Sequence, residues 1–60
     1  MNSKQLIKKL KEAGWKEVRV RGSHHQFSHP NFDHVVTIPH PKKDLGVGLI
    51  KAIRKQAHLE

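Results

Sequence analysis

The first stretch with a regular pattern places apolar side chains at helical spacing over residues 3–13. Lysines fill most of the opposite face. This arrangement predicts an amphipathic α-helix. Asn2 or Ser3 is placed to cap its start, and Gly14 is placed to end it in a left-handed turn. Because the apolar stripe is narrow and aliphatic, packing against a sheet is favoured over binding to a membrane.

In the middle of the chain the pattern changes to the two-residue alternation that is typical of β-strands. The Gly22-Ser23 dipeptide is a two-residue loop that closes a hairpin between strands at residues 15–21 and 24–29. A turn that contains proline then leads to a third strand over residues 34–38. The sequence therefore predicts a meander of three antiparallel strands.

The hairpin loop determines which side chains share a face of the sheet. The predicted pairs are Arg21 with His24, Val20 with His25, Arg19 with Gln26, and Val18 with Phe27. Because paired residues share a face, His25 falls on the apolar face, which we expect to be buried, together with both valines and Phe27. His24 falls on the opposite, basic face, where we expect it to be exposed. A one-residue slip or a bulge would exchange the two histidines.

A second apolar stripe at helical spacing covers about residues 47–57, again with basic side chains on the other side. Asp44 could cap this helix, although Gly46 and Gly48 weaken its first turn. The expected fold is α+β, in the order helix, strand, strand, strand, helix. Both helices are expected on one face of a three-stranded antiparallel sheet, with residues 1–60 forming a single domain.

The composition adds a strong positive charge to this small domain. A chain of this size buries only about 60% of the surface that its unfolded form exposes, so a deep catalytic cleft is not expected. The 12 lysines and arginines against 5 aspartates and glutamates give a formal net charge of +7. A polyanion is the natural partner, and charge alone leaves nucleic acid, an anionic membrane surface and an acidic protein open. With no cysteine and no segment like a signal peptide, the expected location is the cytoplasm.

Several short motifs follow one another along almost the whole chain. They are Gly22-Ser23-His24-His25-x-Phe27, Val36-x-Ile38-Pro39-His40-Pro41, Lys43-Asp44-Leu45 and Lys55-Gln56-Ala57. In these motifs the sequence resembles the HicA family of bacterial toxins, also called YcfA-like proteins. The resemblance implies a fold similar to the double-stranded RNA-binding domain, an mRNA-cleaving activity that shuts down translation, and a neutralising antitoxin partner, HicB. It also places the catalytic histidine at His24, with Gly22 and Ser23 shaping the turn.

RNA carries its own nucleophile, the 2′-OH next to the scissile phosphate. An imidazole, with an unperturbed pKa of about 6.5, can take that proton or protonate the leaving 5′-oxygen without a metal or other cofactor. We expect His24 to be this general base or general acid, with Arg19 and Arg21 attracting the phosphate. The products would be a 2′,3′-cyclic phosphate and a 5′-OH, and DNA would be inert. Further RNA contacts inferred from charge are Lys42, Lys43, Lys51, Arg54 and Lys55.

The second acid or base of such a reaction is not identified by the sequence. His29, His34 and His40 lie near predicted strand ends, where any of them could approach His24, although a solvated loop histidine is the simpler interpretation of each. A zinc site is not expected. His25 and His29 lie four residues apart on one predicted strand, and this spacing separates their side chains by about 13 Å.

A non-catalytic RNA-binding module is the main alternative to the nuclease. In such a module, replacing His24 would weaken RNA binding modestly, whereas in a nuclease it would abolish cleavage and leave binding nearly intact. The expected partners are an RNA substrate and a HicB-like antitoxin, without a membrane, and with DNA contacted only through the antitoxin complex.

Overall fold

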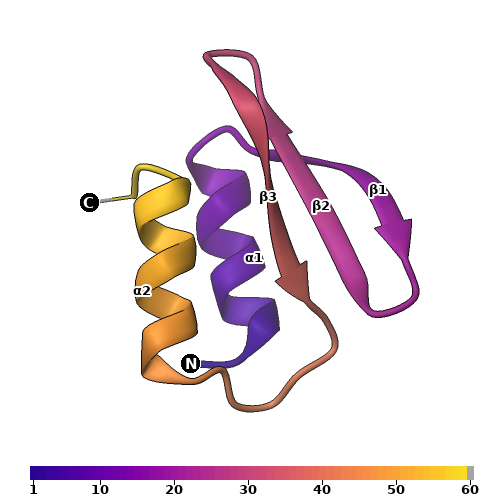
Figure 1. Cartoon of the computed structure of the whole chain (residues 1–60), viewed down its shortest axis with the longest axis vertical. Coiled ribbons are helices and arrows are strands. Elements are labelled where there is room, and N and C mark those ends of the chain that lie inside the picture. Colours follow the sequence, from indigo (N-terminus) through magenta and orange to yellow (C-terminus); the bar gives the residue numbers. More distant parts are fainter. Residues whose placement is uncertain (60) are drawn as a thin grey trace.

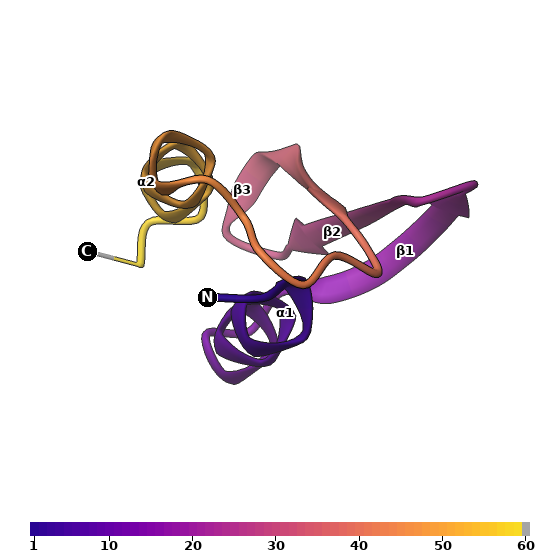
Figure 2. The same cartoon turned by 90° about the horizontal axis from the view of Figure 1, so that it is seen from below.

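The computed structural model describes residues 1–59, and within them the chain forms two helices and three strands. The elements are α1 (Ser3–Glu12), β1 (Lys16–Arg21), β2 (His24–His29), β3 (Phe32–Pro39) and α2 (Val47–Gln56). The strands form one antiparallel sheet in the order β1-β2-β3. Both helices lie on the same side of this sheet, where they contact β3 (Figures 1 and 2). The predicted fold class and order of elements are confirmed.

One face of the sheet and the apolar stripes of the two helices form the core. Its buried members are Leu6, Leu10, Trp15, Phe27, Val36, Ile38, Leu45, Ile53 and Ala57. Phe27 pairs with Val36 across β2 and β3, and both side chains are fully buried. Trp15 closes one end of the core, because its indole N–H donates to the carbonyl of Ala57 at 3.1 Å and its ring stacks on Phe32 at 5.5 Å between centroids.

The hairpin register agrees with three of the four predicted pairs. Arg21 pairs with His24, Val20 with His25, and Arg19 with Gln26. The fourth prediction is wrong, because Glu17 rather than Val18 lies opposite Phe27. The register shifts between Glu17 and Arg19, so Val18 is an additional residue of the kind that makes a β-bulge.

The helices leave β1 uncovered, so the predicted burial of its two valines is also wrong. Val18 is 57% exposed and Val20 is 51% exposed. Figure 2 shows β1 extending away from both helices, which lie below and beside the other two strands. Two helices of 10 residues each cover β3 and part of β2, and residues 1–59 form no further element that could cover the first strand.

The helix caps follow the sequence at the first helix but not at the second. Asn2 caps α1, where its side chain accepts from the N–H of Gln5 and the Gln5 side chain accepts from the N–H of Asn2. The cap of α2 is Gly46, without a side-chain hydrogen bond, so the predicted cap by Asp44 is wrong. Each helix ends one residue before its predicted end, at a C-cap alanine.

Gly14 allows the end of α1 to lie close to β2. Its φ is +100°, and a Cβ added there would lie 2.7 Å from Nε2 of His29. That nitrogen donates to the carbonyl of Ala13 at 3.0 Å. We expect Gly14→Ala to lower the free energy of unfolding by about 2–3 kcal/mol, because backbone strain adds to displacement of the imidazole. Urea unfolding followed by circular dichroism measures the loss.

Gly22→Ala is the matched control for Gly14→Ala. Gly22 also has a positive φ, +59°, but no atom lies within 4 Å of the added Cβ. Gly22→Ala should therefore lower the free energy of unfolding only through backbone strain, by about 1 kcal/mol. Equal losses in the two variants would contradict a steric role for the contact between Gly14 and His29.

Candidate functional site

His24 is the first residue of β2 and directly follows the two-residue turn. Its backbone pairs with Arg21 on one side and with Pro39 on the other. The side chain is exposed, and the register places it on the same outer face as Arg21 and Arg19. Gly22 adopts the left-handed conformation in the turn. The imidazole therefore lies on a basic surface that solvent reaches.

His25 lies on the opposite face and is held by a carboxylate. Its Nδ1–H donates to Oε1 of Glu17, and its side chain is 19% exposed. This partner comes from the register shift, which places Glu17 opposite Phe27 and hence on the inner face. The inward orientation of His25 agrees with the predicted register, whereas its carboxylate partner was not anticipated.

His40 lies at the same end of the sheet as His24. Its backbone N–H donates to the carbonyl of Ser23 at 2.7 Å, and its Nδ1 lies 2.7 Å from Oγ of Ser3. Its ring meets that of His25 edge-on, with 5.0 Å between centroids. The end of β3 and the start of α1 are therefore joined beside the β1–β2 turn.

His29 and His34 lie at the opposite end, where they hold the C-terminal ends of the two helices. Nε2 of His29 donates to the carbonyl of Ala13 at 3.0 Å, and Nε2 of His34 donates to the carbonyl of Gln56 at 2.7 Å. Of the three histidines near strand ends, His40 is therefore the one that the structure brings to the end where β2 begins.

The cations predicted to bind RNA fall into three groups. They are Arg19 and Arg21 on β1, Lys42 and Lys43 between β3 and α2, and Lys51, Arg54 and Lys55 on α2. Lys42 and Lys43 line a hollow of about 430 Å³ together with His40, so they lie near the start of β2. Arg54 and Lys55 lie in the last turn of α2, at the opposite end of the molecule (Figure 1), and are not brought to the turn.

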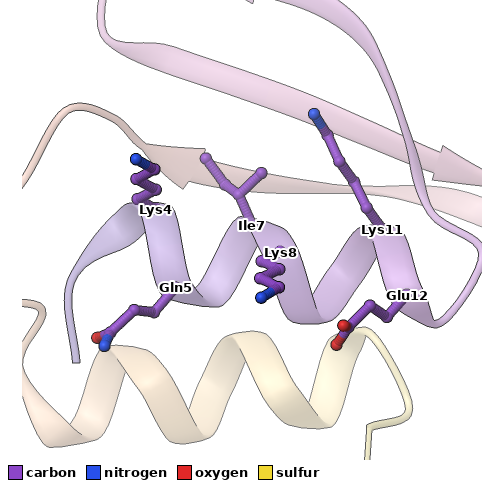
Figure 3. Close-up of a pocket in the computed structure, with 6 residues that line it drawn as sticks. All are labelled: Lys4, Gln5, Ile7, Lys8, Lys11 and Glu12. Atoms are coloured by element: carbon purple, nitrogen blue, oxygen red, sulfur yellow. The ribbon is translucent and has the colours of Figure 1, made fainter.

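A larger hollow of about 610 Å³ runs along α1, and the residue-level predictions did not include its cations. Its lining residues are Lys4, Gln5, Ile7, Lys8, Lys11 and Glu12 (Figure 3). Lys4 also lines the hollow beside His40. The basic surface therefore continues from the turn end of the sheet along the helix. The sequence signal for it is the spacing of three and four residues between these lysines.

Two further observations concern metals and membranes. Within residues 1–59, no three histidine, aspartate or glutamate side chains are grouped so that they could hold a metal ion. In the same part of the chain, no helix has both the length and the apolar character needed to cross a bilayer.

The fold and its histidine-bearing hairpin define a small basic α+β domain with one open face of the sheet. The family model described as HicA toxin of bacterial toxin-antitoxin matches residues 3–59. The chain belongs to this family, as its motifs predicted. It is also similar to a chain in a solved structure described as the HicA3 and HicB3 toxin-antitoxin complex, with 35% identity and a TM-score of 0.86 over 97% of this chain and 94% of that chain. Comparison with curated proteins gives no significant match.

Proposed function

We propose that this toxin is a ribonuclease that cleaves mRNA and thereby inhibits translation and growth, with His24 as the general base or general acid. The observation that carries the proposal is the exposed imidazole of His24 opposite Arg21 at the start of β2. Membership of the HicA family and the formal net charge of +7 support an RNA substrate.

The neighbours of His24 suit a phosphodiester. Arg19 and Arg21 place guanidinium groups on its face, where they attract the phosphate and stabilise charge that develops on it. Gly22 and Ser23 shape the turn, and the space beside Gly22 is open. An RNA strand can therefore approach the backbone closely at this point.

We also infer that a HicB-like antitoxin neutralises the toxin by covering this surface. The similar solved structure is a toxin–antitoxin complex, and a basic surface is complementary to an acidic partner. RNA and antitoxin would then compete for one face, and contact with DNA would occur only through the complex.

Cleavage of a labelled oligoribonucleotide by the purified toxin tests the mechanism. We expect a 2′,3′-cyclic phosphate and a 5′-OH at the cut, because the 2′-oxygen attacks the phosphorus. A single 2′-deoxy substitution at the cleaved nucleotide should abolish that cut, and excess chelator should leave the rate unchanged.

Other outcomes would separate the alternatives. Products with a 3′-OH would rule out attack by the 2′-oxygen. Loss of activity in chelator that added zinc restores would indicate a metal-dependent reaction. Tight RNA binding with no cleavage by the wild type would favour the non-catalytic module.

A further inference from the structure

We propose that His40 is the second acid–base group of this toxin and acts with His24 on the same RNA phosphate. The inference rests on the proposed ribonuclease activity. Attack by the 2′-oxygen needs one group to remove its proton and another to protonate the departing 5′-oxygen. In a concerted displacement His24 cannot do both at once.

His24 and His40 lie on two sides of one end of the sheet. Pro39 is the ladder partner of His24, and His40 follows it in the chain. His24 belongs to the outer face, whereas the ring of His40 contacts His25, which belongs to the inner face. In an in-line displacement the attacking and leaving oxygens lie on opposite sides of the phosphorus. In the proposed complex the phosphate lies over the end of the sheet beside the β1–β2 turn, and one imidazole approaches it from each face.

The hydrogen bonds of His40 leave one ring nitrogen for proton exchange. Oγ of Ser3, a residue only 1% exposed, accepts the N–H of Lys42 at 2.9 Å and donates to the carbonyl of Lys42 at 3.2 Å. Nδ1 of His40 lies 2.7 Å from the same Oγ, so this hydrogen bond occupies one of the two ring nitrogens. Nε2 of His40 has no hydrogen-bond partner within the described residues and is the atom that can gain and lose a proton.

His25 and Glu17 position the His40 ring from its other side. The Glu17 carboxylate accepts Nδ1–H of His25, which fixes the orientation of that imidazole. The fixed ring then meets His40 edge-on at an interplanar angle of 87°. Ser3 on one side and His25 on the other therefore restrict His40, as expected for a preorganised acid–base group.

The surroundings of His40 suit a phosphate. Besides the histidine, the hollow of about 430 Å³ is lined by Asn2, Ser3, Lys4, Pro41, Lys42 and Lys43. Three of these residues carry ammonium groups and none is acidic, so an anion is attracted to the space next to the imidazole. Lys4 also lines the hollow along α1, which gives the adjoining nucleotides a basic path.

The proposed step transfers one proton at the attacking oxygen and one at the leaving oxygen. The 2′-oxygen forms a bond to phosphorus as one imidazole accepts its proton, and the bond between phosphorus and the 5′-oxygen breaks as the other imidazolium donates a proton to the leaving group. The products are a 2′,3′-cyclic phosphate and a 5′-OH. The two histidines have exchanged protonation states, and exchange with solvent restores them.

A pair of RNA substrates tests the role of His40 directly. One has the ordinary 5′-oxygen at the cleaved bond, and the other has sulfur there, which leaves without protonation. On the oxygen substrate, His40→Ala and His40→Asn should lower kcat by about 10²–10⁴-fold with KM nearly unchanged. Sulfur should restore cleavage to near the wild-type rate for either the His40 or the His24 variants, but not for both. The histidine whose variants regain cleavage on the sulfur substrate is then the general acid, and the other histidine is the general base.

Control variants separate chemistry from folding. His40→Asn keeps an amide that can contact Ser3, and circular dichroism shows whether each variant is folded. His34→Gln, at the opposite end of the molecule, should keep the wild-type kcat. Ser3→Ala and Glu17→Gln should lower kcat by about tenfold at constant KM, because they loosen the His40 ring without removing it.

Several results would overturn the proposal. A folded His40→Asn with the wild-type kcat would do so, as would a loss confined to KM or a failure of sulfur to restore any histidine variant. Failure of the ribonuclease itself looks different, because the wild type would then leave RNA intact or His24→Ala would cut it at the full rate. If the wild type leaves RNA intact, both proposals are wrong. If His24→Ala cuts RNA at the full rate, His24 is not catalytic, and the proposal that His40 acts together with it is wrong.

Discussion

Replacing His24 with alanine is expected to lower the rate of RNA cleavage by about 10²–10⁴-fold. The side chain is exposed and does not belong to the core, so its removal deletes an acid–base group without removing packing. RNA binding should remain nearly unchanged, because Arg19 and Arg21 stay on the same face. Single-turnover cleavage and fluorescence anisotropy with the same labelled RNA measure the two effects separately.

The same variant should be harmless in cells. Induction of the wild type is expected to arrest growth, whereas induction of His24→Ala at equal protein levels should not. His58→Asn provides a comparison, because that imidazole is also exposed but stacks on Phe32 away from the turn. Full cleavage by a folded His24→Ala would remove this imidazole from the mechanism. If the wild type does not cleave RNA and His24→Ala binds RNA more weakly than the wild type, the protein is instead a non-catalytic binding module.

Trp15→Ala is expected to reduce the free energy of unfolding by about 3–5 kcal/mol. The indole is 2% exposed, stacks on Phe32, and donates to the carbonyl of Ala57. Small domains have total stabilities near the low end of about 5–15 kcal/mol, so the variant should be largely unfolded at physiological temperature. Urea and thermal unfolding followed by circular dichroism measure the loss.

Trp15→Phe separates packing from the hydrogen bond. Phenylalanine keeps a ring next to Phe32 but leaves the carbonyl of Ala57 without its indole donor. We expect an intermediate loss of about 1–3 kcal/mol. A loss as large as that of Trp15→Ala would contradict a packing role for the remaining aromatic ring, and no loss would contradict a role for the indole hydrogen bond.

Local patterns in the sequence account for most of the fold. The Gly22-Ser23 loop and the strand alternation predict the pairing of the residues nearest the turn, because loop length sets register. The prediction fails at Val18, four residues before Gly22, where an additional residue enters the strand. A bulge conserves the alternation on each side of itself, so the pattern alone does not locate it.

Contacts between distant parts of the chain could not be predicted in this way. Ser3 and His40 are 37 positions apart, and their contact depends on how α1 meets the end of the sheet. The Glu17 carboxylate reaches His25 only because of the register shift. The motif of the HicA family predicts His24 as the catalytic residue, whereas the proposal of His40 rather than His29 or His34 needed the three-dimensional arrangement.

The uncovered first strand affects how copies of this protein meet. β1 is an outer strand with one edge unpaired, and such an edge can join the edge of another molecule into a longer sheet. Here Lys16, Arg19 and Arg21 lie along that strand, and the irregularity at Val18 interrupts its hydrogen-bonding row. Two copies placed edge to edge would bring these cations together. The charge that attracts a polyanion thus also discourages this protein from assembling with itself through β1.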